Sequence, residues 1–136
     1  MTVLKVQEFL RNQGQVDFYT PATVHLDLLK AKYAINYRSH TIFPHLYGLK
    51  YDQIDSPFSE EIVRECRGLI LNSLDNWEAL CCPFFKFFNY GESLAAEIDW
   101  NTAKVQEKID GSLCSLWWYN GWKILVHYLL IFQQEN

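Results

Sequence analysis

The stretch QEKIDGSL, residues 106–113, holds the side chains of this sequence that are best suited to chemistry. Lys108 is followed two residues later by Asp110 and Gly111, and then by a small hydroxyl residue and a leucine. A lysine amine becomes a nucleophile when it loses its proton, and cationic neighbours or partial burial favour that loss. Gly111 has no side chain and lets a phosphate approach its backbone, while Asp110 can fix the turn. The stretch therefore fits a lysine that attacks a phosphate.

A structural interpretation of the same residues competes with this one. Asp-Gly pairs often join two strands, and a surface lysine can precede such a turn by chance, so on this stretch alone we favour the structural interpretation. Attack of Lys108 on the α-phosphate of a nucleotide would form a lysyl-AMP phosphoramidate. That reaction needs further cations around the triphosphate, which screen negative charge as pyrophosphate leaves. Other basic residues of the chain therefore decide between the two interpretations.

Two other stretches place a cation in an unusual setting. ECRGLIL, residues 65–71, puts Arg67 beside a glycine just before a predicted strand. FFKFFNYGE, residues 84–92, puts Lys86 inside an aromatic cluster, where removing a charge from water is costly. A lysine whose stem packs on phenylalanines while its amine stays in water would also explain the second stretch. We expect Lys108, Arg67 and Lys86 to converge on one concave face if they serve one triphosphate.

The motifs ECRG, KFFN with YGE, and KxDGSL, in this order and spacing, resemble the phage-type RNA ligases, a tRNA-repair family of ATP-dependent polynucleotide ligases. The segment LKYDQIDSP before ECRG fits the same family, and the resemblance runs from about Leu29 to Trp122. It implies the N-terminal half of a ligase-type nucleotidyltransferase domain. It also implies ATP and Mg²⁺ as cofactors, and RNA with 5′-phosphate and 3′-hydroxyl ends as the partner, with tRNA among the candidates.

The resemblance also implies roles for individual residues. Lys108 would be the lysine that becomes adenylylated, and Asp110 and Gly111 belong to its motif. Arg67 and Lys86 would contact the nucleotide phosphates. No residue is assigned to a metal.

Three more residues would line the nucleotide pocket. Phe88 is expected as an aromatic wall, although Phe87 can exchange roles with it. Tyr51 is expected as a pocket tyrosine, in a part of the alignment that can slip. Glu107 would face the adenine, and a solvent-facing strand position suits it equally well.

Composition and charge set the class of protein. The 136 residues are 49% hydrophobic and 16% aromatic, which fits one globular domain. The net charge is −4, but residues 1–50 carry six Lys/Arg against three Asp/Glu, so a polyanion would favour that part. A solvated charged surface explains most of these charges equally well. The four cysteines form no CxxC pair and the four histidines lack zinc-ligand spacing, so we expect reduced thiols in a cytoplasmic protein without a membrane segment.

The apolar periodicity predicts helices early and strands late, hence an α+β fold with mainly antiparallel sheet. We expect Thr2 to cap the first helix, Gly14 to stop it, and an Asn-Gly turn at 120–121 to form a hairpin. The expected elements are helices over 2–14, 21–34 and 92–100, a helical turn after Ser59, and strands over 67–71, 77–82 and 104–109.

The end of the sequence departs from the family pattern. After Lys123 it continues as ILVHYLLIFQQEN, where relatives have a Ser/Thr/Gly-rich segment with a further lysine and later acidic motifs. We expect residues 1–136 to be a single partial domain with an atypical tail at 124–136. A truncated gene product with a shifted reading frame near Leu125 would explain the tail, and a naturally short variant is the alternative. Such a ligase would be weakly active or inactive. A non-catalytic remnant or a nucleotide- or RNA-binding module is the alternative, and a DNA ligase or capping enzyme fits the motifs less well.

Overall fold

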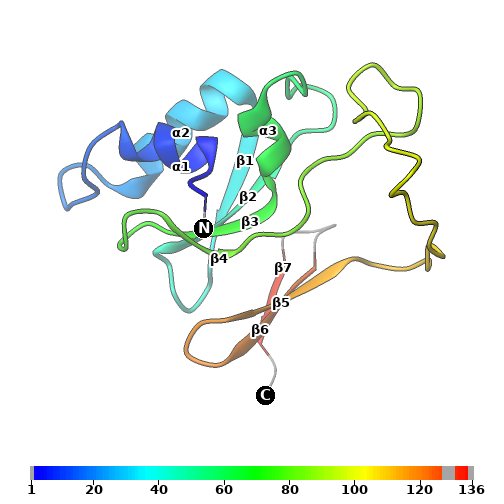
Figure 1. Ribbon diagram of the computed structural model, residues 1–136. Coiled ribbons are helices and arrows are strands. Elements are labelled where there is room, and N and C mark those ends of the chain that lie inside the picture. The colour runs from blue at the N-terminus through cyan, green and yellow to red at the C-terminus, as the bar shows by residue number, and fades with distance from the viewer. Residues whose placement is uncertain (1, 127–130, 135–136) are drawn as a thin grey trace.

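The computed structural model describes residues 2–126 and 131–134 and has an α+β architecture (Figure 1). The expected fold class is therefore confirmed. The elements, in chain order, are α1 (Lys5–Arg11), α2 (Ala22–Tyr33), β1 (Ile35–Ser39), β2 (Leu46–Tyr51), α3 (Glu61–Glu65), β3 (Arg67–Asn72), β4 (Glu78–Cys81), β5 (Cys114–Trp118), β6 (Trp122–Val126) and β7 (Ile131–Gln134).

The main sheet is a four-stranded antiparallel meander in the order β1-β2-β3-β4, with the three helices gathered beside it (Figure 1). The central strand β3 is buried along nearly its whole length and apolar on both faces, as its sequence RGLILN suggests. Leu69 and Leu71 pack with Leu26 and Leu29 of α2, whereas Ile70 points to the other side, because side chains alternate along a strand. Both faces of the main sheet are therefore covered.

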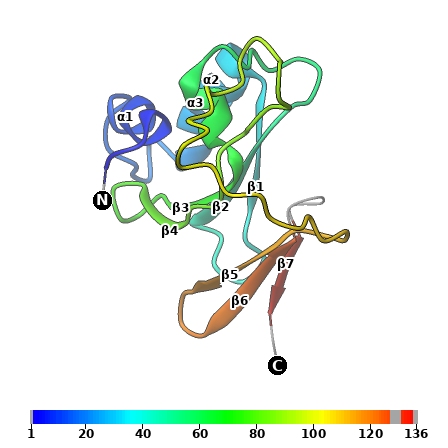
Figure 2. The ribbon, with the colours of Figure 1, turned by 45° about the vertical axis from the view of Figure 1, so that its right-hand side comes forward.

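The second cover is a smaller antiparallel sheet in the order β5-β6-β7, which lies beneath the main sheet in Figures 1 and 2. Trp117 and Leu125 of this sheet pack against Leu46, Ile70 and Cys81 of the main sheet. Its hairpin turns at Asn120 and Gly121, which have φ angles of 50° and 122°. The predicted Asn-Gly hairpin is confirmed, and it is what brings β6 back along β5.

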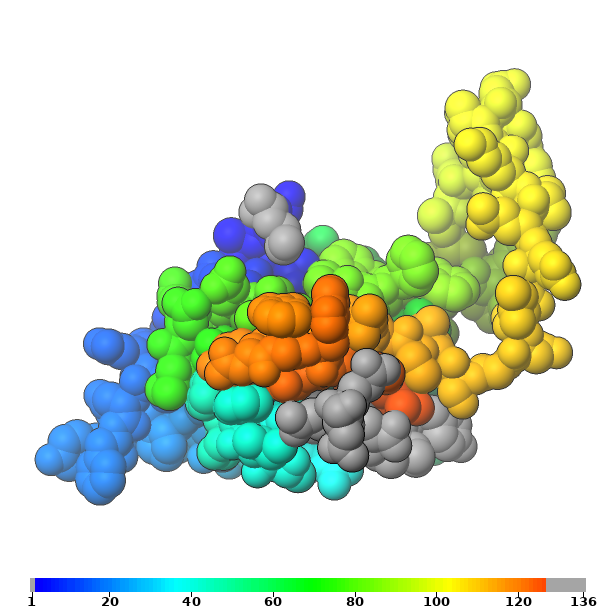
Figure 3. Space-filling view, turned by 90° about the horizontal axis from the view of Figure 1, so that it is seen from below, coloured from blue at the N-terminus to red at the C-terminus, as the bar shows by residue number. Residues whose placement is uncertain are grey.

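A long connection between β4 and β5, residues 82–113, contains neither helix nor strand. Its middle stands away from the body of the molecule, as the yellow arm in Figure 3 shows. The predicted strand over 104–109 and the predicted helix over 92–100 are therefore wrong. Val105 and Ile109, which suggested the alternation, are 99% and 84% exposed, so no packed face rewards a strand there.

Helix ends also differ in detail from the expectation. The first helix begins at Lys5, where Leu4 occupies the cap position and the Gln7 side chain accepts the Leu4 N–H at 2.9 Å, so Thr2 does not cap it. The helix ends at Arg11, before Gly14. Helix α2 agrees with the prediction. Helix α3 begins at Glu61 with Glu60 in the cap position, so Ser59 does not cap it.

Among the described residues, none of the helices is long and apolar enough to cross a membrane. The expected tail at 124–136 is described in part: residues 124–126 belong to β6, residues 131–134 form β7, and residues 127–130 and 135–136 lie outside the described residues.

Candidate functional site

A β-bulge in the main sheet sets two cations side by side. Leu49 of β2 pairs with Leu69 of β3, but the next residue, Lys50, pairs with Arg67, so Gly68 is the extra residue. Gly68 has a φ of 85°, a left-handed conformation that favours glycine. Like charges directly opposite one another on a sheet repel, so this arrangement attracts an anion.

Lys50 and Arg67 both line a cavity of about 270 Å³. The cavity lies between the bulged edge of the main sheet and the end of the long connection, where the chain enters β5. It is lined by Lys50, Tyr51, Gln53, Arg67, Gly68, Gly111, Ser112 and Leu113. Three residues predicted from sequence, Arg67, Tyr51 and Gly111, thus lie on one cavity although they come from distant parts of the chain.

The loop after β2 owes its shape to Asp52. Its Oδ1 atom accepts the backbone N–H groups of Ile54 and Asp55, both at 2.8 Å. These hydrogen bonds, from Asp55 first and then Ile54, lower the pKa of Asp52, so its carboxyl stays ionised. The turn they form places Gln53 on the cavity wall beside Tyr51, which explains why the LKYDQIDSP stretch belongs to the site.

Lys86 lies at a second cavity, which Phe87 and Phe88 also line. Its amine lies 5.0 Å from the centre of the Phe88 ring and 5.6 Å from that of Phe58. Its backbone N–H donates to the Arg64 carbonyl at 2.8 Å, and this bond ties the start of the long connection to α3. Arg64 in turn donates to the Phe58 and Ser59 carbonyls at 2.8 and 2.9 Å. Lys86 is thus half-buried between two aromatic rings, whose faces stabilise a cation.

Aromatic contacts connect the two cavities. The Phe58 ring meets Tyr51 edge-on at 5.0 Å and Phe88 at 6.3 Å. Phe87 and Phe88 both line the second cavity, but the Phe87 ring lies 5.0 Å from the Arg67 guanidinium, whereas the Phe88 ring lies 5.0 Å from the Lys86 amine. The two phenylalanines, which the sequence could not tell apart, therefore have different partners.

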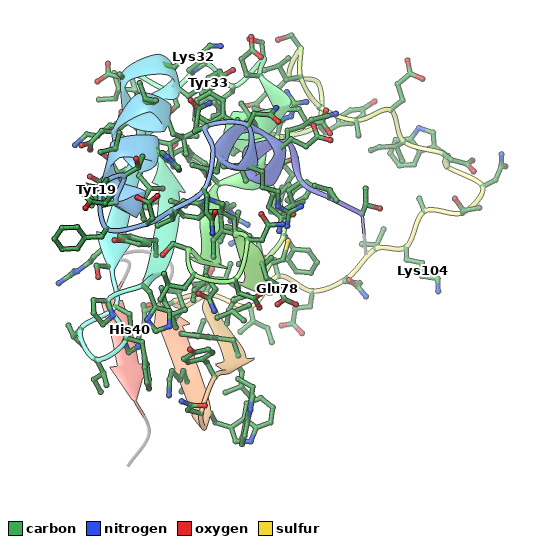
Figure 4. The ribbon with its side chains drawn as sticks, turned by 90° about the vertical axis from the view of Figure 1, so that its left-hand side faces the viewer. Tyr19, Lys32, Tyr33, His40, Glu78 and Lys104 are labelled. Atoms are coloured by element: carbon green, nitrogen blue, oxygen red, sulfur yellow. The ribbon has the colours of Figure 1, made fainter. Side chains whose placement is uncertain are left out.

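Lys108 lies on neither of these two cavities. Its side chain is 91% exposed and its amine lies 3.8 Å from Asp110 Oδ1. Glu107 is exposed on the same segment, and the nearby Lys104 points away from the body in Figure 4. The structure therefore does not bring Lys108, Lys86 and Arg67 onto one concave face, although Gly111, three residues beyond Lys108, lines the arginine's cavity.

Two cations of the site were missed from the sequence. Lys50 precedes Tyr51 in a stretch that already resembled the family, and Arg64 lies three residues before Arg67. The signal for Lys50 was its position beside Tyr51, but only the bulge shows that it opposes Arg67.

Mg²⁺, which the resemblance implies, finds no ready set of ligands. Among the described residues no three His, Cys, Asp or Glu side chains are grouped so that they could hold a metal ion.

Comparisons with known proteins agree with the motifs. The chain is 34% identical to an RNA ligase of Rhodothermus phage RM378, over 58% of this chain and 23% of the relative. It is 36% identical to a putative bifunctional polynucleotide kinase/RNA ligase of Autographa californica nuclear polyhedrosis virus, over 63% of this chain and 13% of the relative. This chain is similar to viral RNA ligases. No family model and no solved structure matches it.

The resemblance deduced from the motifs is thus confirmed by two curated relatives. The chain spans less than a quarter of the length of either one. What the relatives' names say of their activity is therefore carried to this chain only as a proposal.

Proposed function

We propose that this chain supplies the nucleotide-binding part and the nucleophile of an ATP-dependent RNA ligase. The observation that carries the proposal is the cavity on which Lys50, Arg67 and Gly111 meet. Two opposed cations and glycine backbone suit a polyphosphate, because guanidinium and ammonium groups bind phosphate oxygens and glycine lets them approach. The similarity to the two RNA ligases supports the same function.

In the proposed first step the Lys108 amine attacks the α-phosphorus of ATP. A P–N bond forms, the bond from the α-phosphorus to the bridging oxygen breaks, pyrophosphate leaves, and the amine gives up a proton. Lys50 and Arg67 hold the phosphates and offset the charge that develops on the leaving group. Lys86 is the proposed further contact to the phosphates, and Phe88 and the neighbouring rings line the pocket for the rest of the nucleotide.

Lys108 is close enough along the chain for this role. A chain extends at most about 3.3–3.6 Å per residue, so the Lys108 Cα lies within roughly 11 Å of the Gly111 Cα on the cavity. The intervening side chains are exposed and do not pack, so the segment around Lys108 can turn inward without breaking a core. Gly111, at a φ of 138° with open space around it, is a suitable pivot.

In the later steps the AMP passes to RNA. An oxygen of a 5′-phosphate attacks the phosphorus of lysyl-AMP and the P–N bond breaks. A 3′-hydroxyl then attacks the 5′-phosphorus and AMP leaves. RNA with these two ends, tRNA included, is the proposed partner. The exposure of Lys108 favours one alternative, a module that binds nucleotide or RNA without catalysis.

The test is covalent labelling with ATP that carries its label in the α-phosphate, in the presence of Mg²⁺. We expect the wild-type chain to carry at most a trace of label, at Lys108, and Lys108→Ala and Lys108→Arg to lose it, because a guanidinium is not a usable nucleophile. Lys104→Ala is the matched control, since it removes a lysine from the same exposed segment, and it should keep the label.

Two results would contradict the proposal. Labelling that survives Lys108→Ala would exclude Lys108 as the nucleophile. ATP binding by the wild type without any label would favour the non-catalytic alternative. The prediction that residues 1–136 by themselves seal RNA weakly or not at all is measured separately, by circularisation of a 5′-phosphorylated RNA.

A further inference from the structure

Two exposed cysteines flank the long connection and share a cavity. Cys82 directly follows β4, and Cys114 is the first residue of β5. Both line a cavity of about 250 Å³, together with Pro83, Phe84, Leu113 and Ser115. This cavity adjoins the one that holds Arg67, since Leu113 lines both, but it shares no lining residue with the Lys86 cavity, and the proposed function does not use it.

A neighbouring contact joins the two strands beside which the cysteines lie. The Cys81 thiol is hydrogen-bonded to the Ser115 side chain. Cys82 directly follows Cys81 in the sequence, and Cys114 directly precedes Ser115. The contact between β4 and β5 thus holds together the two strand ends that carry the cysteines, while the side chains of Cys82 and Cys114 are exposed to solvent.

We propose that Cys82 and Cys114 are an oxidation site that forms an intramolecular disulfide. The other two cysteines lack this setting. Cys66 is completely buried at the junction of α3 and β3, and Cys81 is buried between the two sheets. A disulfide needs two thiols that can approach and that an oxidant can reach, and among the four cysteines Cys82 and Cys114 are the two that are exposed and line one cavity.

The oxidant class is a small disulfide such as oxidised glutathione. The thiolate of one cysteine attacks a sulfur of the oxidant, which gives a mixed disulfide and releases one glutathione thiolate. The thiolate of the second cysteine then attacks the protein-side sulfur of the mixed disulfide and releases the second glutathione. Two protein thiols are oxidised to one disulfide, and one glutathione disulfide is reduced to two thiols.

The bond would join the two ends of the connection. Residues 83–113, which include Lys108, would become a closed loop whose ends cannot separate. In the reduced protein the ends are held by non-covalent packing, chiefly of β5 on β4 and of the small sheet on the main sheet. The oxidation state of this pair therefore sets how firmly the lysine-bearing arm is attached at its base.

The experiment treats the purified protein with oxidised glutathione and then blocks remaining thiols with an alkylating reagent. Peptide mapping should find Cys82 joined to Cys114, with Cys66 and Cys81 reduced. Brief trypsin treatment should cut the exposed connection after Lys104 or Lys108. The nicked chain should migrate as one species on a non-reducing gel and separate into two after reduction.

Cys82→Ser and Cys114→Ser are the matched variants, and since both side chains are exposed, neither change disturbs the core. Each should abolish the linked species. The proposal is overturned if the mapped bond is Cys81–Cys82, if the link forms mainly between two molecules, or if each cysteine carries glutathione without a bond between them.

Discussion

Trp77 is the residue on which the two N-terminal helices and the main sheet converge. Its side chain is 2% exposed. Its carbonyl accepts the Gln7 side-chain N–H from α1 at 2.8 Å, and its ring lies 6.3 Å from that of His25 on α2 and 6.4 Å from that of Tyr47 on β2. Trp77→Ala keeps the backbone acceptor and removes the ring, so its effect measures the packing alone.

The expected loss follows from burial and chain length. Deleting a buried tryptophan side chain costs about 3–5 kcal/mol, from lost transfer energy and the cavity left behind. An unfolding entropy of roughly 2.1 cal/mol/K per residue gives about 0.29 kcal/mol/K for a chain of this length. Trp77→Ala should therefore lower the melting temperature by about 10–17 °C.

The assay is thermal unfolding followed by circular dichroism, with Trp118→Ala as the control. Trp118 is 59% exposed and meets Trp122 edge-on at 5.2 Å, a contact worth about 0.5–1.5 kcal/mol, so its loss should lower the melting temperature by no more than about 5 °C. Equal losses for the two variants would refute the view that Trp77, and not tryptophan content in general, holds the helices to the sheet.

Two further predictions concern titrating groups. Burial lowers the pKa of His25 below its usual 6.5, with Asp17 opposing, so the unfolded chain takes up the proton first. The contribution of His25 to the free energy of unfolding should then be fully present above about pH 6.5 and be lost as the pH drops below that value. His25→Leu should flatten this pH dependence in urea unfolding measured from pH 5 to 8. The Tyr37 hydroxyl donates to Asp27 at 2.5 Å, and this bond with burial raises the pKa of Tyr37 to about 12. Absorbance titration should show one tyrosine ionising near that value, and Asp27→Asn should return it toward 10; an unchanged titration would disprove the pairing.

The parts of the fold that could be predicted are those whose local signals and packing agree. The helix at 22–33 begins after Pro21 and buries Leu26 and Leu29, and Asn120-Gly121 has the left-handed backbone that such a turn needs. The alternation in KVQEKID had a strand's period but no surface to pack against, so the strand did not form. Periodicity predicts which face would be buried, and whether anything covers that face is a tertiary property.

The residues of the candidate site also divide into those that sequence motifs predicted and those that depend on tertiary structure. Arg67 and Tyr51 were found from motifs, and they do share a cavity. Lys50 was missed because its pairing with Arg67 depends on a one-residue bulge, which shifts the register between strands and leaves no separate mark in either sequence. The distance between Lys108 and that cavity was also beyond prediction, since it depends on the path of a connection without regular structure.

The sequential order of the main sheet has a consequence for how the chain folds. Each strand from β1 to β4 pairs with its neighbour in sequence, so the longest connection that the meander must close is residues 52–66, between β2 and β3. The β5–β6 hairpin can form by itself, but joining it to the meander must close the whole of residues 82–113. Hydrogen exchange should therefore find β2 and β3 protected early in refolding, and β5 protected late.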